Sequence, residues 1–213
     1  MQSTVLALLS RSHKNKCAKL HLGCFDRVFD GWLNTDVTGH IFLARVPGAS
    51  SLLKTLSFIS TERYIQHQQG IFKRVEYLDV TSRFPLRADS FSYVYSAHML
   101  NNFYPEDAQK CVSEIYRVLK KGGIFRISLP DLDELIAGYD SLQPGAFLSH
   151  LFQASQRKEK NRHHWMYNQR SLEQLLRTAG FSEIKKWEYK VGQCADVEII
   201  DQRPGGLFIE ATK

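Results

Sequence analysis

The chain has 213 residues, of which 43% are hydrophobic and 23% charged, with a net charge of +6 at pH 7. These are the proportions of a soluble globular protein, and they exclude a disordered, collagen-like or membrane-embedded chain. The positive charge is spread along the sequence and leaves both an anionic small molecule and RNA open as partners.

The length fits one α/β core, so we predict a short N-terminal appendage over residues 1–16 and a single domain over residues 17–213. The apolar stretch Val5 to Leu9 has five residues, too few for a membrane span. Four cysteines without a C-x-x-C pair predict neither a zinc site nor a disulfide framework. We therefore expect a cytoplasmic protein that requires no metal.

Seven short runs of β-branched, aromatic and leucine residues predict strands. They are Lys19 to Leu22, Leu33 to Val37, Val75 to Leu78, Phe91 to Ser96, Ile124 to Leu129, Ile184 to Tyr189 and Leu207 to Ala211.

Three segments carry helix signals. The first begins with Pro105 at its first position, follows an apolar period of 3.6 residues, and is expected to stop at Gly122 and Gly123. Capping-box patterns predict the other two, one starting at Asp131 with Glu134 and one at Ser171 with Gln174. The first helix lies between two predicted strands, so we expect an α/β fold with a right-handed parallel crossover.

Three residues follow successive predicted strands: Gly23, Asp36 and Asp79. Glycine after the first strand of such a sheet lets a nucleotide cofactor approach the backbone, and a carboxylate after the second strand can accept hydrogen bonds from ribose hydroxyls. Because the carboxyl ends of parallel strands meet in one crevice, the three residues together indicate a cofactor site more strongly than any one alone.

Three stretches carry a resemblance to a known family: KLHLGCFDRVFDGWLNTD (residues 19–36), FPLRADSFSYVYSAHMLNNF (84–103) and EIYRVLKKGGIFRISLPD (114–131). They resemble class I S-adenosylmethionine-dependent methyltransferases of the small methyltransferase-domain type. The resemblance implies a Rossmann-like, seven-stranded sheet, mostly parallel with the last strand antiparallel, flanked by helices.

The resemblance also implies S-adenosylmethionine as the cofactor. Gly23 would lie under its methionine portion, Asp36 at the ribose and Asp79 near the adenine. The expected cofactor-binding residues are His21, Gly23, Cys24, Asp36, Asp79, Val80, Ser96 and Ala97.

Three departures from the family pattern bear on activity: Phe25 stands where a glycine is usual, Ser92 replaces an aspartate, and Asn101-Asn102 replaces Glu-His. The Phe25 ring either blocks the cofactor or points away from it. We expect it to turn toward the core, since burying a phenyl ring is worth about 1.5 to 3 kcal/mol.

Methyl transfer gains most from holding donor and acceptor in line, so a dedicated catalytic residue is not essential. A hydroxyl acceptor benefits from a general base, for which His98, His163 and His164 are the candidates by residue type. His98 has the better position, just past the fourth strand, although a pocket-lining or structural histidine is the other interpretation. His163, His164 and Tyr167 are the candidate acceptor-binding residues, although the same loop could simply pack its aromatic rings on the core.

A small-molecule or glycan-type acceptor is the expected partner, with RNA ranked below it because no basic groove interleaved with aromatic residues is legible. A catalytically silent protein that keeps the fold for binding or scaffolding is the alternative, motivated by the three departures. An NAD-dependent oxidoreductase is disfavoured, since no G-x-G-x-x-G follows a predicted strand. The oligomeric state is left open.

Overall fold

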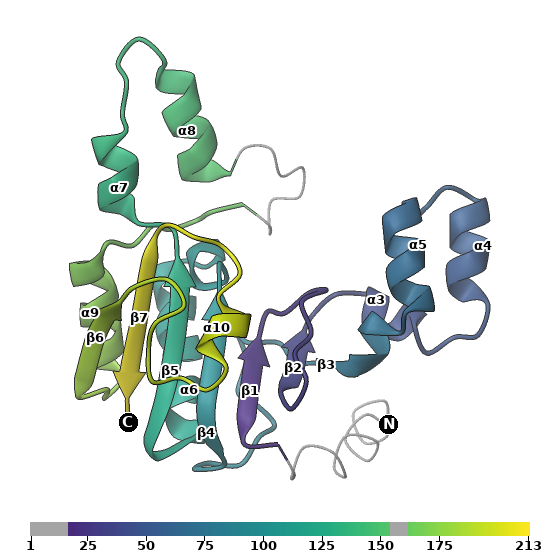
Figure 1. Ribbon diagram of the computed structural model, residues 1–213, viewed down its shortest axis with the longest axis horizontal. Coiled ribbons are helices and arrows are strands. Elements are labelled where there is room, and N and C mark those ends of the chain that lie inside the picture. The colour runs from purple at the N-terminus through teal and green to yellow at the C-terminus, as the bar shows by residue number, and fades with distance from the viewer. Residues whose placement is uncertain (1–16, 154–161) are drawn as a thin grey trace. The chain divides into compact units, whose positions relative to one another are not determined.

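The computed structural model describes residues 17–153 and 162–213. The chain divides into two compact units, Met1–Asp79 and Val80–Lys213, which are shown in Figure 1 and described in turn. The predicted appendage, residues 1–16, lies outside the described residues, and the single domain stays a prediction.

Three parallel strands form the sheet of the first unit: β1 (Lys19–Leu22), β2 (Leu33–Asp36) and β3 (Val75–Tyr77). Leu22 pairs with Thr35, and Asp36 pairs with Tyr77, so the carboxyl ends of all three strands lie at one edge. Residues 23–32 connect β1 to β2 without a helix, as the short spacing predicts.

Helical segments fill the connection between β2 and β3, where the sequence analysis predicted none. They are α3 (His40–Leu43), α4 (Ala49–Thr55), α5 (Thr61–Gln68) and the 3-10 helix η1 (Ile71–Arg74). Ile41 is fully buried and packs with Cys24 and Val75, which ties α3 to the strands. The sequence signal was weak because α4 buries none of its residues and so lacks an apolar face that a pattern could reveal.

Four strands form the sheet of the second unit, in the order β4 (Phe91–Ala97), β5 (Leu119–Leu129), β7 (Leu207–Thr212) and β6 (Glu183–Trp187). Strands β4 and β5 are parallel, whereas β7 is antiparallel to both β5 and β6. The whole sheet has seven strands in the order β3-β2-β1-β4-β5-β7-β6. The predicted α/β class, mostly parallel with the last strand antiparallel, is therefore confirmed.

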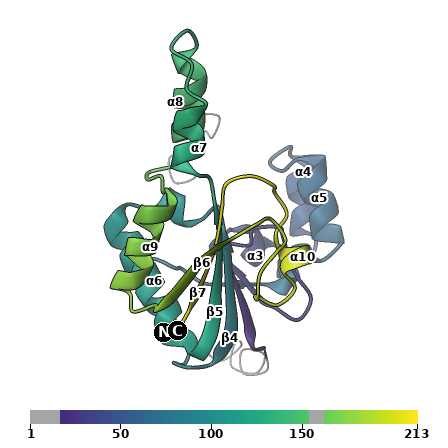
Figure 2. The same cartoon turned by 60° about the vertical axis from the view of Figure 1, so that its left-hand side comes forward.

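Helices α6 (Pro105–Val118) and α9 (Gln169–Thr178) lie together on one side of the second unit's sheet, and α10 (Val197–Ile200) lies on the other (Figure 2). Their apolar faces supply the core, because Val112, Ile115 and Leu176 are fully buried. The remaining helical segments are η2 (Leu100–Asn102), α7 (Leu132–Ala137) and α8 (Pro144–Phe152).

Two predicted helix boundaries are corrected, and the strand predicted from Ile124 begins at Leu119. Helix α6 ends at Val118 rather than at Gly122, because Leu119 turns to an extended backbone and pairs with Phe91. The last of the predicted helices begins at Gln169 with Asn168 as its N-cap, and Ser171 is the third helical residue of that capping box. Helix α8, with Pro144 at its start, lies where the sequence analysis predicted no helix.

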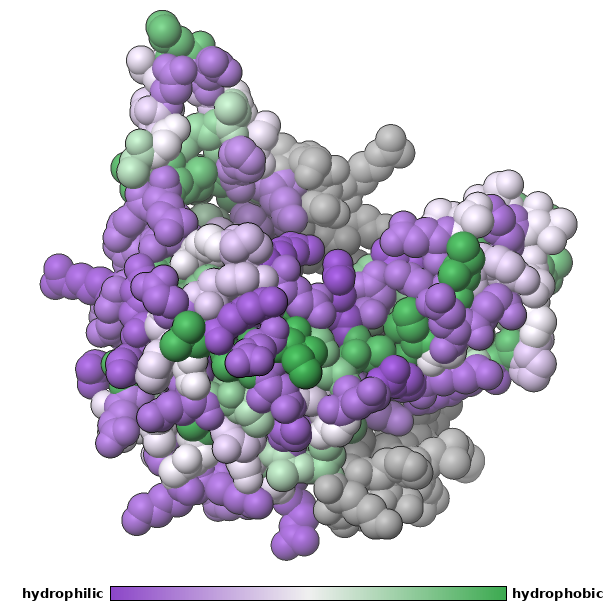
Figure 3. All heavy atoms as spheres, viewed as in Figure 1, coloured by the Kyte–Doolittle hydropathy of each residue, from purple (hydrophilic) through white to green (hydrophobic). Residues whose placement is uncertain are grey.

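The visible surface is mostly hydrophilic, with hydrophobic patches between the charged side chains (Figure 3). Several large apolar side chains of α3 to α5 and the segment that joins them are exposed, among them Leu52, Leu56 and Phe58. Within the described ranges, no helix is both long and apolar enough to cross a bilayer.

Candidate functional site

The turn after β1 has a left-handed backbone at two positions, a conformation that glycine adopts most easily. Gly23 and Phe25 both have positive φ angles, +67° and +46°. A left-handed backbone costs a residue with a Cβ roughly 1 to 2 kcal/mol, so Phe25 occupies a conformation suited to the family's glycine. Such an outlier beside a candidate ligand site is a feature that the surrounding structure must maintain.

Asp36 holds this turn in place. Its Oδ2 accepts a hydrogen bond of 2.9 Å from the backbone N–H of Phe25, and its Oδ1 accepts one of 2.8 Å from Thr38 N–H. The backbone N–H of Cys24 donates to the carbonyl of Thr35 at 3.0 Å. The ends of β1 and β2 are thus joined through backbone donors and one carboxylate.

The Phe25 ring packs on helical residues of the first unit. The Arg63 guanidinium carbon lies 4.3 Å from the ring centroid, and the rings of His40 and Phe72 lie 6.3 and 6.2 Å away. The residue is still 37% exposed, so the expectation that the ring moves into the core is not met. A guanidinium covering one ring face replaces core burial as the stabilising contact.

Two expected cofactor-binding residues have buried side chains. His21 stacks on Phe29, with ring centroids 4.8 Å apart, and its Nδ1 lies 3.3 Å from Asn34 Oδ1. Burial lowers the pKa of His21 to about 4, partly opposed by Asn34, and burial raises the pKa of the Cys24 thiol above its usual range. Both side chains are therefore neutral near pH 7, and they pack on the buried side of the turn.

Asp79 follows Leu78, whose N–H donates to the carbonyl of Asp36 at 3.1 Å. Gly23, Asp36 and Asp79 accordingly lie at one edge of the first unit's sheet. Asp26, which the sequence analysis did not single out, binds Arg63 and Gln66 of α5 at 2.6 and 3.0 Å.

The second unit holds Val80, Ser96, Ala97 and His98. His98 directly follows β4, has a positive φ of +48°, and donates its N–H to the Ser128 carbonyl at 2.9 Å. Its pKa is lowered to about 4, first by burial and then by the charges of Arg203 and His163. The imidazole is therefore neutral near pH 7.

Several buried polar side-chain atoms near the end of β4 have no hydrogen-bond partner among the described residues. They are Ser96 Oγ, His98 Nε2, Asn101 Oδ1, His163 Nδ1 and Tyr167 Oη. Buried polar atoms are nearly always paired, because an unmade hydrogen bond costs about 1 to 3 kcal/mol. Unpaired buried atoms of this kind are expected where a ligand or water completes a site.

The loop of candidate acceptor-binding residues reaches this cluster. The N–H groups of His164 and Trp165 donate to the Asn101 carbonyl at 2.9 and 3.1 Å, and the His164 ring lies 4.8 Å from that of Tyr104. Burial lowers the pKa of His163, and burial raises the pKa of Tyr167 to about 12. The sequence analysis treated Asn101 only as a departure from the family pattern, whereas the structure buries it and binds its carbonyl to this loop.

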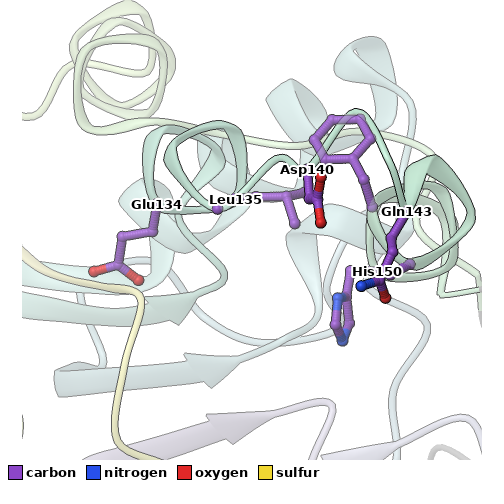
Figure 4. Close-up of a pocket in the computed structure, with 8 residues that line it drawn as sticks. Glu134, Leu135, Asp140, Gln143 and His150 are labelled. Atoms are coloured by element: carbon purple, nitrogen blue, oxygen red, sulfur yellow. The ribbon is translucent and has the colours of Figure 1, made fainter.

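A separate cavity of about 430 Å³ lies between α7 and α8 (Figure 4). Its lining residues are Glu134, Leu135, Gly138, Asp140, Gln143, Ala146, Phe147 and His150. Gln143 and His150 lie together there, whereas Glu134 points away from them (Figure 4) and accepts a 3.1 Å hydrogen bond from Gly206 N–H. No group of three metal-ligating side chains occurs in the part of the chain that the structure describes.

A mostly parallel seven-stranded sheet with one antiparallel strand, and acidic residues following its second and third strands, defines the class I methyltransferase fold. The family model described as "Methyltransferase domain" matches residues 57–127, about a third of the chain. That match begins after the Gly23 turn. A search of curated protein sequences finds no match.

Solved structures agree on the fold. A SAM-dependent methyltransferase from Archaeoglobus fulgidus aligns with a TM-score of 0.50 at 16% identity, covering 100% of this chain and 95% of that one. The DszA carbon methyltransferase aligns with a TM-score of 0.51 at 14% identity, covering 97% of this chain and 49% of that one. A possible exported protein from Bordetella parapertussis aligns at 0.50 and 11% identity, covering 100% and 67%. The resemblance to class I methyltransferases is confirmed, and at these identities the agreement concerns the fold.

Proposed function

We propose that this chain transfers a methyl group from S-adenosylmethionine to an acceptor. The observation that carries the proposal is the carboxylate of Asp36, held at the end of β2 by the backbone N–H groups of Phe25 and Thr38. The methyltransferase fold and the left-handed backbone at Gly23 and Phe25 support it.

The residues of the first unit fit the adenosine and methionine portions of that cofactor. Each Asp36 oxygen accepts one backbone hydrogen bond, and an ionised carboxylate offers about four acceptor positions in all, so capacity remains for ribose hydroxyls. Gly23 presents backbone without a Cβ for the methionine portion, and Asp79 is proposed to face the adenine. His21 and Cys24 act by supporting the turn from its buried side.

The residues of the second unit fit the reacting end. S-adenosylmethionine supplies an electrophilic methyl group on a sulfonium. Ser96 Oγ and Asn101 Oδ1 are buried polar atoms without partners among the described residues, and we assign them to orienting the bound molecules. Val80 and Ala97 complete the proposed lining. Holding the reactants in line is the main source of rate in such a displacement.

His98 is proposed as the base for a hydroxyl acceptor. Its imidazole is neutral because its pKa is lowered to about 4, and its Nε2 has no described hydrogen-bond partner. His163, His164 and Tyr167 are proposed to contact the acceptor. We propose a small molecule or a glycan-type compound as that acceptor, and the cytoplasm as the compartment.

A catalytically silent binding protein is the alternative, and Phe25 is the observation that favours it. A benzyl group on the cofactor turn, 37% exposed, stands where the family pattern has hydrogen. Isothermal titration with S-adenosylmethionine and S-adenosylhomocysteine separates the two. Stoichiometric binding supports the methyltransferase, whereas no heat of binding with folded protein contradicts it.

A further inference from the structure

Two neighbouring side chains in the loop after β1, those of Phe25 and Asp26, contact the same residue of α5. The Arg63 guanidinium carbon lies 4.3 Å from the centroid of the Phe25 ring, and Arg63 Nη1 donates to Asp26 Oδ2 at 2.6 Å. One guanidinium therefore binds an aromatic ring and a carboxylate together, because a planar cation can cover a ring while its N–H groups donate. All three residues belong to the first unit.

The ion pair between Arg63 and Asp26 is shielded from solvent and reinforced by a third residue. The two side chains are 24% and 17% exposed. Gln66, three residues along α5, accepts from Arg63 Nη1 and donates from its Nε2 to Asp26 Oδ2 at 3.0 Å. Burial opposes the ionisation of Asp26, but the hydrogen bonds from Arg63 and Gln66 outweigh it, so the pKa of Asp26 lies below its usual value. The ion pair is therefore formed at neutral pH.

Arg63 is itself fixed by the way α5 begins. Its backbone N–H donates at 3.2 Å to the side chain of Ser60, the N-cap of the helix. An N-cap serine satisfies an N–H group of the first turn and so defines where the helix starts. Beside the Phe25 ring, the fully buried Phe72 stacks on His40 with ring centroids 4.8 Å apart. The Phe25 ring thus packs next to an ordered pair of rings, with the Arg63 guanidinium over it.

The backbone of Phe25 needs these contacts. A left-handed backbone is unfavourable for a residue with a Cβ, and Phe25 has a φ of +46°. Its N–H nevertheless donates to Asp36 Oδ2, on the carboxylate proposed to bind the ribose. The side-chain contacts of Phe25 and Asp26 with α5 offset the cost of this backbone. The geometry of the proposed cofactor turn therefore depends on Arg63, which lies 37 positions beyond Asp26 in the sequence.

We infer that Arg63 is a positioning residue for cofactor binding, because it holds the Phe25 ring and the Asp26 carboxylate on α5 and so keeps the Phe25 N–H on Asp36. The inference rests on the proposed binding of S-adenosylmethionine, whereas the control of the turn by Arg63 stands on the first unit alone. Glycine adopts the left-handed backbone without assistance, so the role of Arg63 should exist only while residue 25 carries a side chain.

The first measurement is calorimetric titration of S-adenosylhomocysteine into the natural chain, Arg63→Gln, Phe25→Gly and the double variant. Arg63→Gln should weaken binding at least about tenfold in the natural chain but at most about twofold in the Phe25→Gly background, where no ring has to be held. Arg63→Lys keeps the positive charge without the planar group and should recover part of the lost affinity. An equal loss in both backgrounds, or no recovery with lysine, overturns the inference.

The matched control is Arg45→Gln. It removes another arginine of the first unit that forms an ion pair, with Glu76 at 3.4 Å, but that makes no contact with the turn in the described structure. The affinity for S-adenosylhomocysteine should be unchanged. A loss equal to that of Arg63→Gln would show that any missing positive charge weakens binding, and it would overturn the assignment to Arg63.

The second measurement does not need the cofactor. Amide hydrogen exchange of the Phe25 N–H, followed by NMR, reports its bond to Asp36, and the Leu78 N–H, bonded to the Asp36 carbonyl at 3.1 Å, is the reference at the same edge. Arg63→Gln should speed exchange at Phe25 at least about tenfold and leave Leu78 unchanged. Unchanged exchange at Phe25, or equal acceleration at both amides, overturns the inference. If the natural protein binds no S-adenosylhomocysteine, the methyl transfer is contradicted, and the exchange result alone decides whether Arg63 controls the turn.

Discussion

The backbone N–H of Phe25 donates a 2.9 Å hydrogen bond to Asp36 Oδ2. This contact joins the residue that departs most from the methyltransferase pattern to the residue that best preserves it. The turn thus keeps its shape although its glycine is replaced, and the Phe25 backbone bears the strain at a φ of +46°.

Phe25→Gly should therefore be more stable than Phe25→Ala by about 1 kcal/mol. Both variants lose the contact with Arg63, but only glycine adopts the left-handed backbone without strain. Urea unfolding of the two proteins measures the difference. Equal free energies of unfolding would show that the turn relaxes out of the left-handed region.

Acid should destabilise the protein over a defined window. The pKa values of His21 and His98 are each about 4 in the folded state and near 6.5 when unfolded, so the unfolded chain binds more protons between those values. Stability from this source is complete above pH 6.5 and is lost as the pH falls toward 4. Unfolding free energies of the protein and of His21→Gln and His98→Gln across this range test it, since each substitution should flatten the slope.

Arg126→Met should cost about 3 to 5 kcal/mol, because it leaves Asp201 and Glu210 buried without their cation. Lys110→Met, which breaks the exposed ion pair with Asp107, is the control and should have no measurable effect. Chemical denaturation of both variants compares them. An unchanged free energy of unfolding for Arg126→Met would mean that the buried ion pairs of Arg126 with Asp201 and Glu210 do not stabilise the fold.

Gly206→Ala should destabilise the protein more than Gly205→Ala. Both positions have a left-handed backbone, with φ of +89° and +85°, but only at Gly206 does a Cβ meet the Leu129 carbonyl oxygen, at 2.3 Å, whereas none of the described atoms lies within 4 Å at Gly205. Thermal unfolding of the pair separates crowding from backbone strain. A lower melting temperature for Gly205→Ala would contradict the close approach.

The sequence predicted the sheet well because each strand carries its own local pattern and punctuation. The Pro105 helix was equally legible, with Glu106 and Asp107 in its first turn. The hydrogen bonds at the N-terminus of α7 were harder to predict. At Asp131 the expected reciprocal partner, Glu134, instead binds Gly206 from 72 residues away, a contact that no local pattern contains.

Within the proposed site, the sequence rules were most specific at the ends of strands. Gly23, Asp36 and Asp79 come from the parallel-sheet rule, because each ends or follows a predicted strand. The unpaired atoms of Ser96 and Asn101, by contrast, depend on burial, which sequence does not display.

The most direct test of the methyl-transfer account is calorimetric titration of S-adenosylhomocysteine into the natural protein and into Asp36→Ala, with circular dichroism to verify folding. The account predicts one cofactor per chain for the natural protein, and binding weakened by about 1.5 to 3 kcal/mol in Asp36→Ala, the cost of lost charge-assisted hydrogen bonds. An unchanged dissociation constant in the variant, or no binding by the natural protein, would contradict it.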